Sequence, residues 1–285
     1  MTTALPKADS RTRLLWLDLT RTCQLHCDHC YNDSGPQGGH GTMTRENWFS
    51  VLDQAAGHGI TNVQFIGGEP TMHPDFPELV ECALDLGLQV EVYSNLVHVS
   101  ERCWTLFQRD RVSLATSYYS DQAAEHNTRT GRASHRRTRA NIQQAVSLGV
   151  PPRVGVIGDS KHAEAARRDL TTLGVTRIGT DYVRPFGRGS AGHAPDMSGL
   201  CGGCGDGTAA IGPDGKVSPC VFSAWIDTGN VKETPLADIL GGAQMQSAST
   251  AIRSVTVGKD PCGPDDDNDD ECSPGYPGSE CTPRN

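Results

Sequence analysis

The chain has no long hydrophobic run, no surplus of basic charge and no apolar N-terminal segment, and each absence excludes a class of protein. No stretch of about 18 apolar residues occurs, so the sequence predicts no membrane span. A formal net charge of −9 argues against nucleic acid as a main partner, because phosphate binding needs a basic surface. Residues Met1 to Lys7 lack the apolar core of a signal peptide. We therefore predict a cytoplasmic protein that binds neither membrane nor nucleic acid.

Cysteine, by contrast, is abundant, with 11 residues in a chain of 285. Disulfide frameworks are rare in the cytoplasm, so these cysteines favour ligation of a metal or an iron–sulfur cluster. A secreted origin would reverse this argument, and nothing in the sequence supports one. The length suits one large domain followed by a smaller one.

Strand-like and helix-like runs alternate over the first two thirds of the chain. This alternation is typical of βαβ units around a parallel sheet, which places ligands at the carboxyl ends of its strands. Thr44 is the expected cap of the first helix. We predict strands over 14–19, 62–66, 88–93, 112–116, 153–157 and 177–183, and helices over 44–56, 75–86, 134–148 and 162–173.

Beyond residue 183 the sequence becomes rich in turns and poor in long periodic segments. Asp214-Gly215 between β-type residues predicts a hairpin over 211–218, and 236–240 fits a short helix. From Lys259 onward Asp, Pro and Gly dominate, so this segment cannot bury enough apolar area to fold unless its cysteines hold it together. We expect a disordered tail over 1–12, a large domain over 13–190 and a cysteine-rich domain over 191–285.

Three cysteines, Cys23, Cys27 and Cys30, follow the first predicted strand within eight residues. A cubane iron–sulfur cluster normally takes four cysteine ligands, so three would leave one iron open to an exogenous molecule. The alternatives are buried free thiols, or a zinc site completed by His26 or His29.

A second motif, Gly67-Gly68-Glu69, ends the second predicted strand. Two glycines allow close approach of the backbone to a ligand, and the carboxylate can accept hydrogen bonds from an ammonium group. Taken alone, the motif could equally be an ordinary turn between a strand and a helix.

Together, in this order and at the ends of strands one and two, the motifs resemble those of the radical S-adenosylmethionine enzymes over about residues 13–190. The resemblance implies an α/β fold, a partial (β/α)6 TIM-like barrel with a small cysteine-rich C-terminal iron–sulfur extension. It implies that Cys23, Cys27 and Cys30 hold a [4Fe–4S] cluster whose open iron chelates S-adenosylmethionine. Gly67, Gly68 and Glu69 would hold the amino group of that cofactor.

The resemblance also suggests weaker cofactor-binding candidates. Ser94 and Asn95 follow strand three, Ser117 is expected at the end of strand four, Tyr31 follows the last cysteine, and Arg184 could pair with a carboxylate. Each could instead be a solvated loop residue. The sequence identifies no catalytic acid, base or hydrogen donor. Cys82 and Cys103 lie in helix-like segments and are expected to be buried structural thiols.

A second set of cysteines follows residue 200 and resembles the opening of the SPASM or Twitch extensions, which hold auxiliary iron–sulfur clusters. The hairpin before Cys220 fits that pattern, whereas the wide spacing further on departs from it. Six thiols cannot complete two cubanes, so we expect at least one auxiliary cluster, with a zinc ribbon as the alternative. The predicted ligands are Cys201, Cys204, Cys220, Cys262, Cys272 and Cys281.

The resemblance implies an enzyme that cleaves S-adenosylmethionine and abstracts hydrogen from a ribosomally made peptide, forming a cross-link, a thioether or an inverted centre. The alternatives are a dehydrogenase or tailoring enzyme for a small molecule such as an amino sugar, and a non-catalytic iron–sulfur sensor or scaffold. Few residues precede the first strand, so a separate leader-binding protein is expected. An electron donor such as flavodoxin or ferredoxin is also implied.

Overall fold

The protein, described here by a computed structural model over residues 12–158 and 160–256, is built on one nine-stranded sheet in the order β6-β5-β4-β3-β2-β1-β7-β8-β9. Neighbouring strands from β6 to β7 pair in parallel. The first six are β1 Leu14–Asp18, β2 Asn62–Ile66, β3 Gln89–Tyr93, β4 Val112–Tyr118, β5 Arg153–Ile157 and β6 Ile178–Asp181. The predicted α/β barrel-like fold is confirmed.

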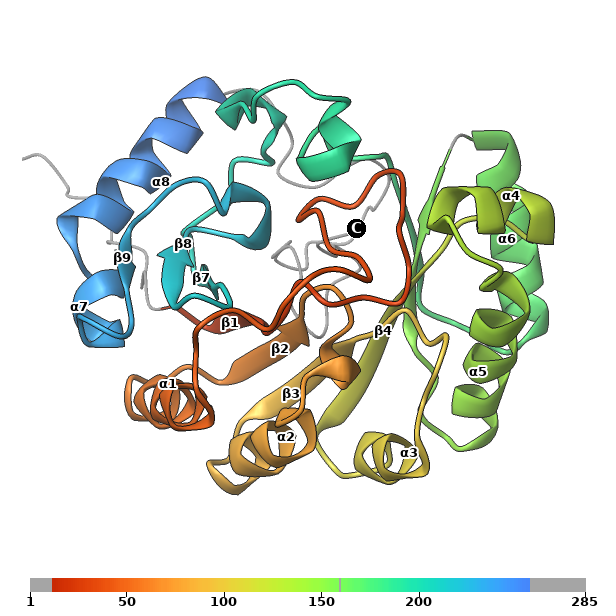
Figure 1. Ribbon diagram of the computed structural model, residues 1–285, viewed down its shortest axis with the longest axis horizontal. Coiled ribbons are helices and arrows are strands. Elements are labelled where there is room, and N and C mark those ends of the chain that lie inside the picture. The colour runs from red at the N-terminus through yellow and green to blue at the C-terminus, as the bar shows by residue number, and fades with distance from the viewer. Residues whose placement is uncertain (1–11, 159, 257–285) are drawn as a thin grey trace, which may run out of the picture.

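Six helices connect these strands, and Figure 1 shows α1, α2 and α3 on the convex face of the curved sheet. They are α1 Arg45–Gly57, α2 Phe76–Asp85, α3 Glu101–Phe107, α4 Ala123–Thr130, α5 His135–Ser147 and α6 Ser160–Thr172. Thr44 caps α1 as predicted, because its side chain accepts from the backbone N–H of Asn47 while the Asn47 side chain accepts from the Thr44 backbone. The short helix α4 was not predicted, whereas α3 forms the helix-like segment expected around Cys103.

Successive side chains along each strand point to opposite faces of the sheet, and this separates two apolar layers. On β1, Leu15 and Leu17 face the helices and join the main core, whereas Leu14 and Trp16 face the concave side and contact the C-terminal extension. The concave side also holds a buried polar group. The Glu91 carboxylate accepts from Arg153 Nε at 3.1 Å and Nη2 at 2.5 Å, and from the Gln64 amide. An ion pair this deeply buried fixes β3 against β5 across the barrel interior.

The extension continues the same sheet, because β7 pairs in parallel with β1. Its elements are β7 Thr208–Ile211, β8 Lys216–Ser218, β9 Gly229–Asn230, α7 Leu236–Leu240 and α8 Ala243–Val255. The predicted hairpin and the short helix at Leu236–Leu240 are confirmed. This part of the chain was expected to be poor in long periodic segments, and the 13-residue helix α8 was not predicted. Its buried face uses the small residues Ala248 and Ser249 beside Met245 and Ile252, which conceals the helical period.

Strand four is longer than predicted and runs to Tyr118, so Ser117 lies inside the strand rather than at its end. No helix in the described part of the chain is long and apolar enough to cross a membrane. The expected N-terminal tail and the Asp-rich segment from Lys259 lie outside the described residues, apart from Thr12.

Candidate functional site

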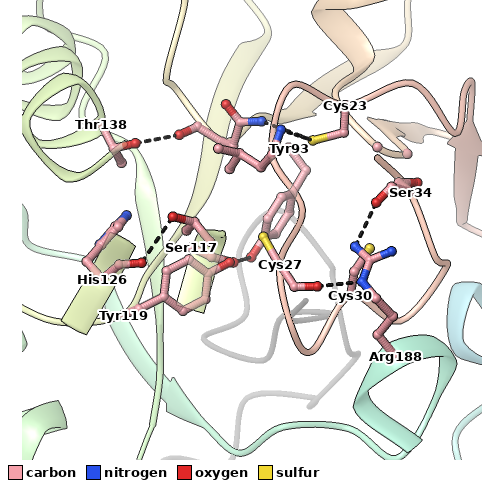
Figure 2. A pocket seen from close by; sticks show the side chains of 15 residues that line it. Cys23, Cys27, Cys30, Ser34, Tyr93, Ser117, Tyr119, His126, Thr138 and Arg188 are labelled. Carbon is pink, nitrogen blue, oxygen red and sulfur yellow. Dashed lines mark hydrogen bonds between the residues drawn. The ribbon is translucent and has the colours of Figure 1, made fainter. Parts of the chain in front are cut away.

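The three cysteines of the loop between β1 and α1 line one cavity at the carboxyl ends of the strands. Cys23, Cys27 and Cys30 face it together with the glycine turn after β2 and residues from β3 and β4 (Figure 2). The cavity is partly open to solvent. The structure therefore brings together the two motifs that stand far apart in the sequence.

Close backbone packing fixes the cysteine loop against the glycine turn. The Gly68 N–H donates to Thr20 O at 2.7 Å, and the Glu69 N–H donates to Thr22 O at 2.9 Å. A Cβ at Gly67 would lie 2.7 Å from Thr20 O, and one at Gly68 would lie 2.5 Å from Thr22 O. Real side chains do not approach a carbonyl this closely, so glycine is needed here to seat the loop as well as to open the cavity.

The cysteine side chains suit a cluster better than a single ion. Burial raises the pKa of Cys23 to about 12 and raises the pKa values of Cys27 and Cys30. Thiols in such surroundings stay protonated until a cation displaces the proton. Within residues 12–158 and 160–256, no three Cys, His, Asp or Glu side chains converge as ligands of one metal ion do. Thiols spread around a cavity fit a cubane, in which different irons bind different cysteines.

Glu69 follows the two glycines but does not itself line the cavity, and its side chain is 1% exposed. Its Oε1 accepts from the Thr71 N–H at 3.2 Å, the Thr71 hydroxyl at 2.7 Å and the Ser94 hydroxyl at 2.9 Å. Its Oε2 accepts from the Asn95 N–H at 2.8 Å. Burial raises the pKa of this carboxyl, although the hydrogen bonds oppose the shift. Within the described residues Oε2 accepts this one hydrogen bond, which leaves it an acceptor position for a ligand donor.

Of the weaker candidates, Asn95 and Ser117 line the cavity. The Asn95 side-chain amide donates toward Cys23 Sγ at 3.6 Å, and the Ser117 hydroxyl lies 3.0 Å from the hydroxyl of Tyr93. Ser94 is buried behind the turn and is bonded to Glu69.

Tyr31 and Arg184 do not line the cavity. Tyr31 is 6% exposed and packs edge-on against Phe222 of the extension, with ring centroids 5.0 Å apart. Arg184 pairs with Asp181 at the end of β6, at 3.0 Å, and lies over the ring of Tyr182. The expected carboxylate partner of Arg184 is therefore supplied by the chain itself.

Several cavity residues were not predicted from the sequence, because they belong to no motif and most of them lie on helices. Tyr119, His126 and Thr138 form the wall opposite the cysteines, and Arg188 closes another side (Figure 2). Thr130 also lines the cavity. The His126 ring packs against Tyr118, Tyr119 and His135, and its Nδ1 has no hydrogen-bond partner within the described chain. Burial lowers the pKa of His126 to about 3, so this ring is neutral at pH 7. The one sequence signal was the position of Tyr119 shortly after the predicted strand over 112–116.

The extension brings a second group of cysteines together. Cys204 and Cys220 are buried with their sulfur atoms 3.1 Å apart. Cys201 packs against the same apolar cluster, and a hydrogen bond from Cys204 lowers its pKa to about 6. The other predicted ligands, Cys262, Cys272 and Cys281, lie outside the described residues. Away from both groups, Cys103 is buried as expected, whereas Cys82 is only partly buried.

Comparison with protein families gives two matches. The model of the Radical SAM superfamily matches residues 17–161, and the model of SPASM, an iron-sulfur cluster-binding domain, matches residues 201–273. The chain is 28% identical to the PqqA peptide cyclase of Streptomyces rochei over 185 residues, 64% of this chain and 51% of that protein. It is 40% identical to the PqqA peptide cyclase of Xanthomonas oryzae pv. oryzae (strain MAFF 311018) over 97 residues, 34% of this chain and 24% of that protein. The match thus spans about half of the first relative and a quarter of the second.

Solved structures resemble this fold at low sequence identity. Streptococcus suis SuiB bound to precursor peptide SuiA superposes with a TM-score of 0.71 at 15% identity, covering 86% of this chain and 67% of SuiB. Native anSMEcpe with bound AdoMet and Cp18Cys peptide gives 0.67 at 13% identity, covering 84% and 82%. BtrN in complex with AdoMet and 2-DOIA gives 0.52 at 14% identity, covering 89% and 92%. At such identities the likeness shows the fold alone.

The first family model covers half of the chain, and the site that it includes carries the cysteine triplet and the glycine turn on one cavity. The SPASM match implies auxiliary iron–sulfur clusters, and the radical SAM match implies a [4Fe–4S] cluster and S-adenosylmethionine. This protein therefore belongs to the radical S-adenosylmethionine superfamily of enzymes.

Proposed function

We propose that this enzyme binds its radical-generating cluster through Cys23, Cys27 and Cys30 and acts on a ribosomally made peptide. The observation that carries the first part is the meeting of the three cysteines and the Gly67–Glu69 turn at one cavity. The domain that forms this site extends over about residues 13–190, and residues 191–285 form the auxiliary-cluster domain.

Each residue of the site has a task in this proposal. The three thiolates ligate the cluster, and the remaining acceptor position of Glu69 receives the ammonium group of S-adenosylmethionine. Asn95 braces Cys23, and Ser117 presents its hydroxyl beside Tyr93 on the cavity wall. When bound, the cluster and S-adenosylmethionine supply a 5′-deoxyadenosyl radical that abstracts hydrogen from the substrate.

The test is anaerobic reconstitution with iron and sulfide, followed by S-adenosylmethionine and dithionite. We expect release of 5′-deoxyadenosine, and its loss when the three cysteines are replaced by alanine. The control is Cys82→Ala, which changes a thiol outside both cysteine groups and should cleave at the unchanged rate. Iron bound without any 5′-deoxyadenosine in the unsubstituted enzyme would refute the proposal.

A peptide substrate is supported by the names of the relatives, which are PqqA peptide cyclases, and by the fold shared with SuiB, whose structure holds a precursor peptide. We propose that a separate leader-binding protein presents the peptide in the cytoplasm, and that a flavodoxin or ferredoxin supplies electrons. A short reading frame for a precursor peptide beside the gene is expected. Co-expression with that peptide should change its mass, and an unchanged mass for every neighbouring frame would count against this substrate class.

A second candidate, oxidation of a small molecule, is favoured by one observation. The chain covers 92% of BtrN, a structure in complex with AdoMet and 2-DOIA, and so nearly equals it in length. Incubation of the reconstituted enzyme with amino-sugar alcohols tests this candidate, and formation of a ketone alongside 5′-deoxyadenosine would replace the peptide proposal.

For the extension, we propose that Cys201, Cys204 and Cys220 bind an auxiliary cluster with ligands from Cys262, Cys272 or Cys281. Their support is the contact between the sulfur atoms of Cys204 and Cys220 and the packing of Cys201 against the same cluster. Replacing Cys204 and Cys220 with alanine should remove about four irons per protein and leave release of 5′-deoxyadenosine intact. An unchanged iron count in that variant would exclude them as ligands.

A further inference from the structure

The segment that follows β6 lies directly on the backbone of the cysteine loop. It forms a short 3-10 helix, Gly187–Ser190, within the turn-rich part of the chain beyond residue 183. Gly187 has a φ of 52°, and a Cβ there would lie 2.4 Å from Cys30 O and 2.5 Å from Tyr31 O. Only glycine allows the two backbones to come this close, so the contact is built into the fold.

Arg188 converts this contact into a clamp. Its Nε donates to Cys27 O at 2.6 Å, its Nη2 donates to Ser34 O at 2.7 Å, and its backbone N–H donates to Cys30 O at 2.9 Å. The planar guanidinium offers donors in a fixed fork, and here the fork joins two carbonyls seven residues apart in the loop. One side chain thereby sets the shape of the loop across Cys27 and Cys30.

Arg188 also brings a permanent charge to the cavity. Among the residues that line it, Arg188 is the one with a side chain that is always charged. A fixed positive charge beside a cluster favours the reduced form, because reduction adds negative charge.

We propose that Arg188 is a positioning residue that holds the cysteine loop in its cluster-binding shape and raises the reduction potential of the cluster bound there. The inference rests on the proposal that Cys23, Cys27 and Cys30 hold that cluster. It connects the beginning of the C-terminal extension to the chemistry of the barrel, since the residue that clamps the loop belongs to the segment leading into the extension.

The experiment compares four reconstituted proteins: the unsubstituted enzyme, Arg188→Gln, Arg188→Lys and Arg102→Gln. Arg102 is an exposed side chain on α3 paired with Glu78, so its change removes a positive charge far from the loop. Two measurements are made on each protein. Redox titration followed by electron paramagnetic resonance gives the potential of the cluster, and hydrogen exchange of the cluster-free protein reports on amides of residues 23–35.

For Arg188→Gln we expect at least a tenfold lower ratio of reduced to oxidised cluster at a fixed potential, a shift of about 59 mV for a one-electron couple. We expect exchange over residues 23–35 to become at least tenfold faster. Arg188→Lys keeps the positive charge but lacks the forked donors of the guanidinium. Its ratio of reduced to oxidised cluster should therefore change less than threefold, whereas exchange over residues 23–35 should still accelerate. Arg102→Gln should match the unsubstituted enzyme in both measurements.

Unchanged exchange and unchanged potential in Arg188→Gln would overturn the inference. If Arg188→Gln does not retain iron, hydrogen exchange of the cluster-free protein still tests whether Arg188 holds the loop. Loss of the Arg188 contacts accelerates exchange whether or not iron binds. Absence of a cluster in the unsubstituted enzyme would instead refute the proposed function. The exchange measurement separates the two failures, because it needs no cluster.

Discussion

Replacement of Arg153 by methionine should destabilise the protein severely, because it leaves the Glu91 carboxylate buried without its cation. Glu91 is completely buried, and Arg153 supplies two of its hydrogen bonds, at 3.1 and 2.5 Å. The amide of Gln64 would remain as its donor. Removing one partner of a buried pair costs about 3–5 kcal/mol.

The assay is urea denaturation of the cluster-free protein under reducing conditions. Arg153→Met should lower the free energy of unfolding by about 3–5 kcal/mol. The double variant Arg153→Met with Glu91→Leu should recover most of that loss, because an apolar replacement of the whole pair is often neutral. The matched control is Arg102→Met, which breaks an exposed pair with Glu78 and should cost at most about 1 kcal/mol.

Two results would refute this reasoning. One is a loss below about 1 kcal/mol for Arg153→Met, which would mean that water or another donor compensates Glu91. The other is a double variant as unstable as the single one, which would mean that packing of the arginine stem, rather than the charge on Glu91, dominates.

Three further outcomes follow from the site. Gly68→Ala would place a Cβ 2.5 Å from Thr22 O and should lower the free energy of unfolding by about 1–3 kcal/mol in chemical denaturation. The control is Gly57→Ala, whose Cβ meets nothing within 4 Å and which should not destabilise the protein. Burial lowers the pKa of His126 from 6.5 to about 3, so the unfolded state binds a proton first as the pH falls. The folded state therefore loses about 1.4 kcal/mol of stability per pH unit between pH 6.5 and 3. His126→Phe should reduce this pH dependence of the free energy of unfolding, and an unchanged slope would contradict the role of His126. Glu69→Gln should raise the KM for S-adenosylmethionine at least tenfold without changing the iron content, and an unchanged KM would remove Glu69 from the binding site.

Much of the barrel could be predicted because its signals are local. The β2 and β5 strands were predicted to the residue, and the α1 cap was correct, since apolar periodicity and capping depend on neighbours in the chain. The helix α8 was missed because its contact face uses alanine and serine, which pack well but do not register as apolar in a sequence pattern. Ser117 was misplaced at a strand end because its strand runs two residues further than predicted.

The sequence by itself determined the family chemistry, because the spacing of Cys23, Cys27 and Cys30 is a property of one short segment and the Gly67–Glu69 turn of another. Only the tertiary structure decided which side chains share the cavity. It directs Tyr31 toward the extension, pairs Arg184 with Asp181, and brings Arg188 onto the cysteine loop from more than 150 residues away in the chain. The physical reason is that a side chain's partners depend on strand register and backbone approach, which long-range packing sets and local spacing does not.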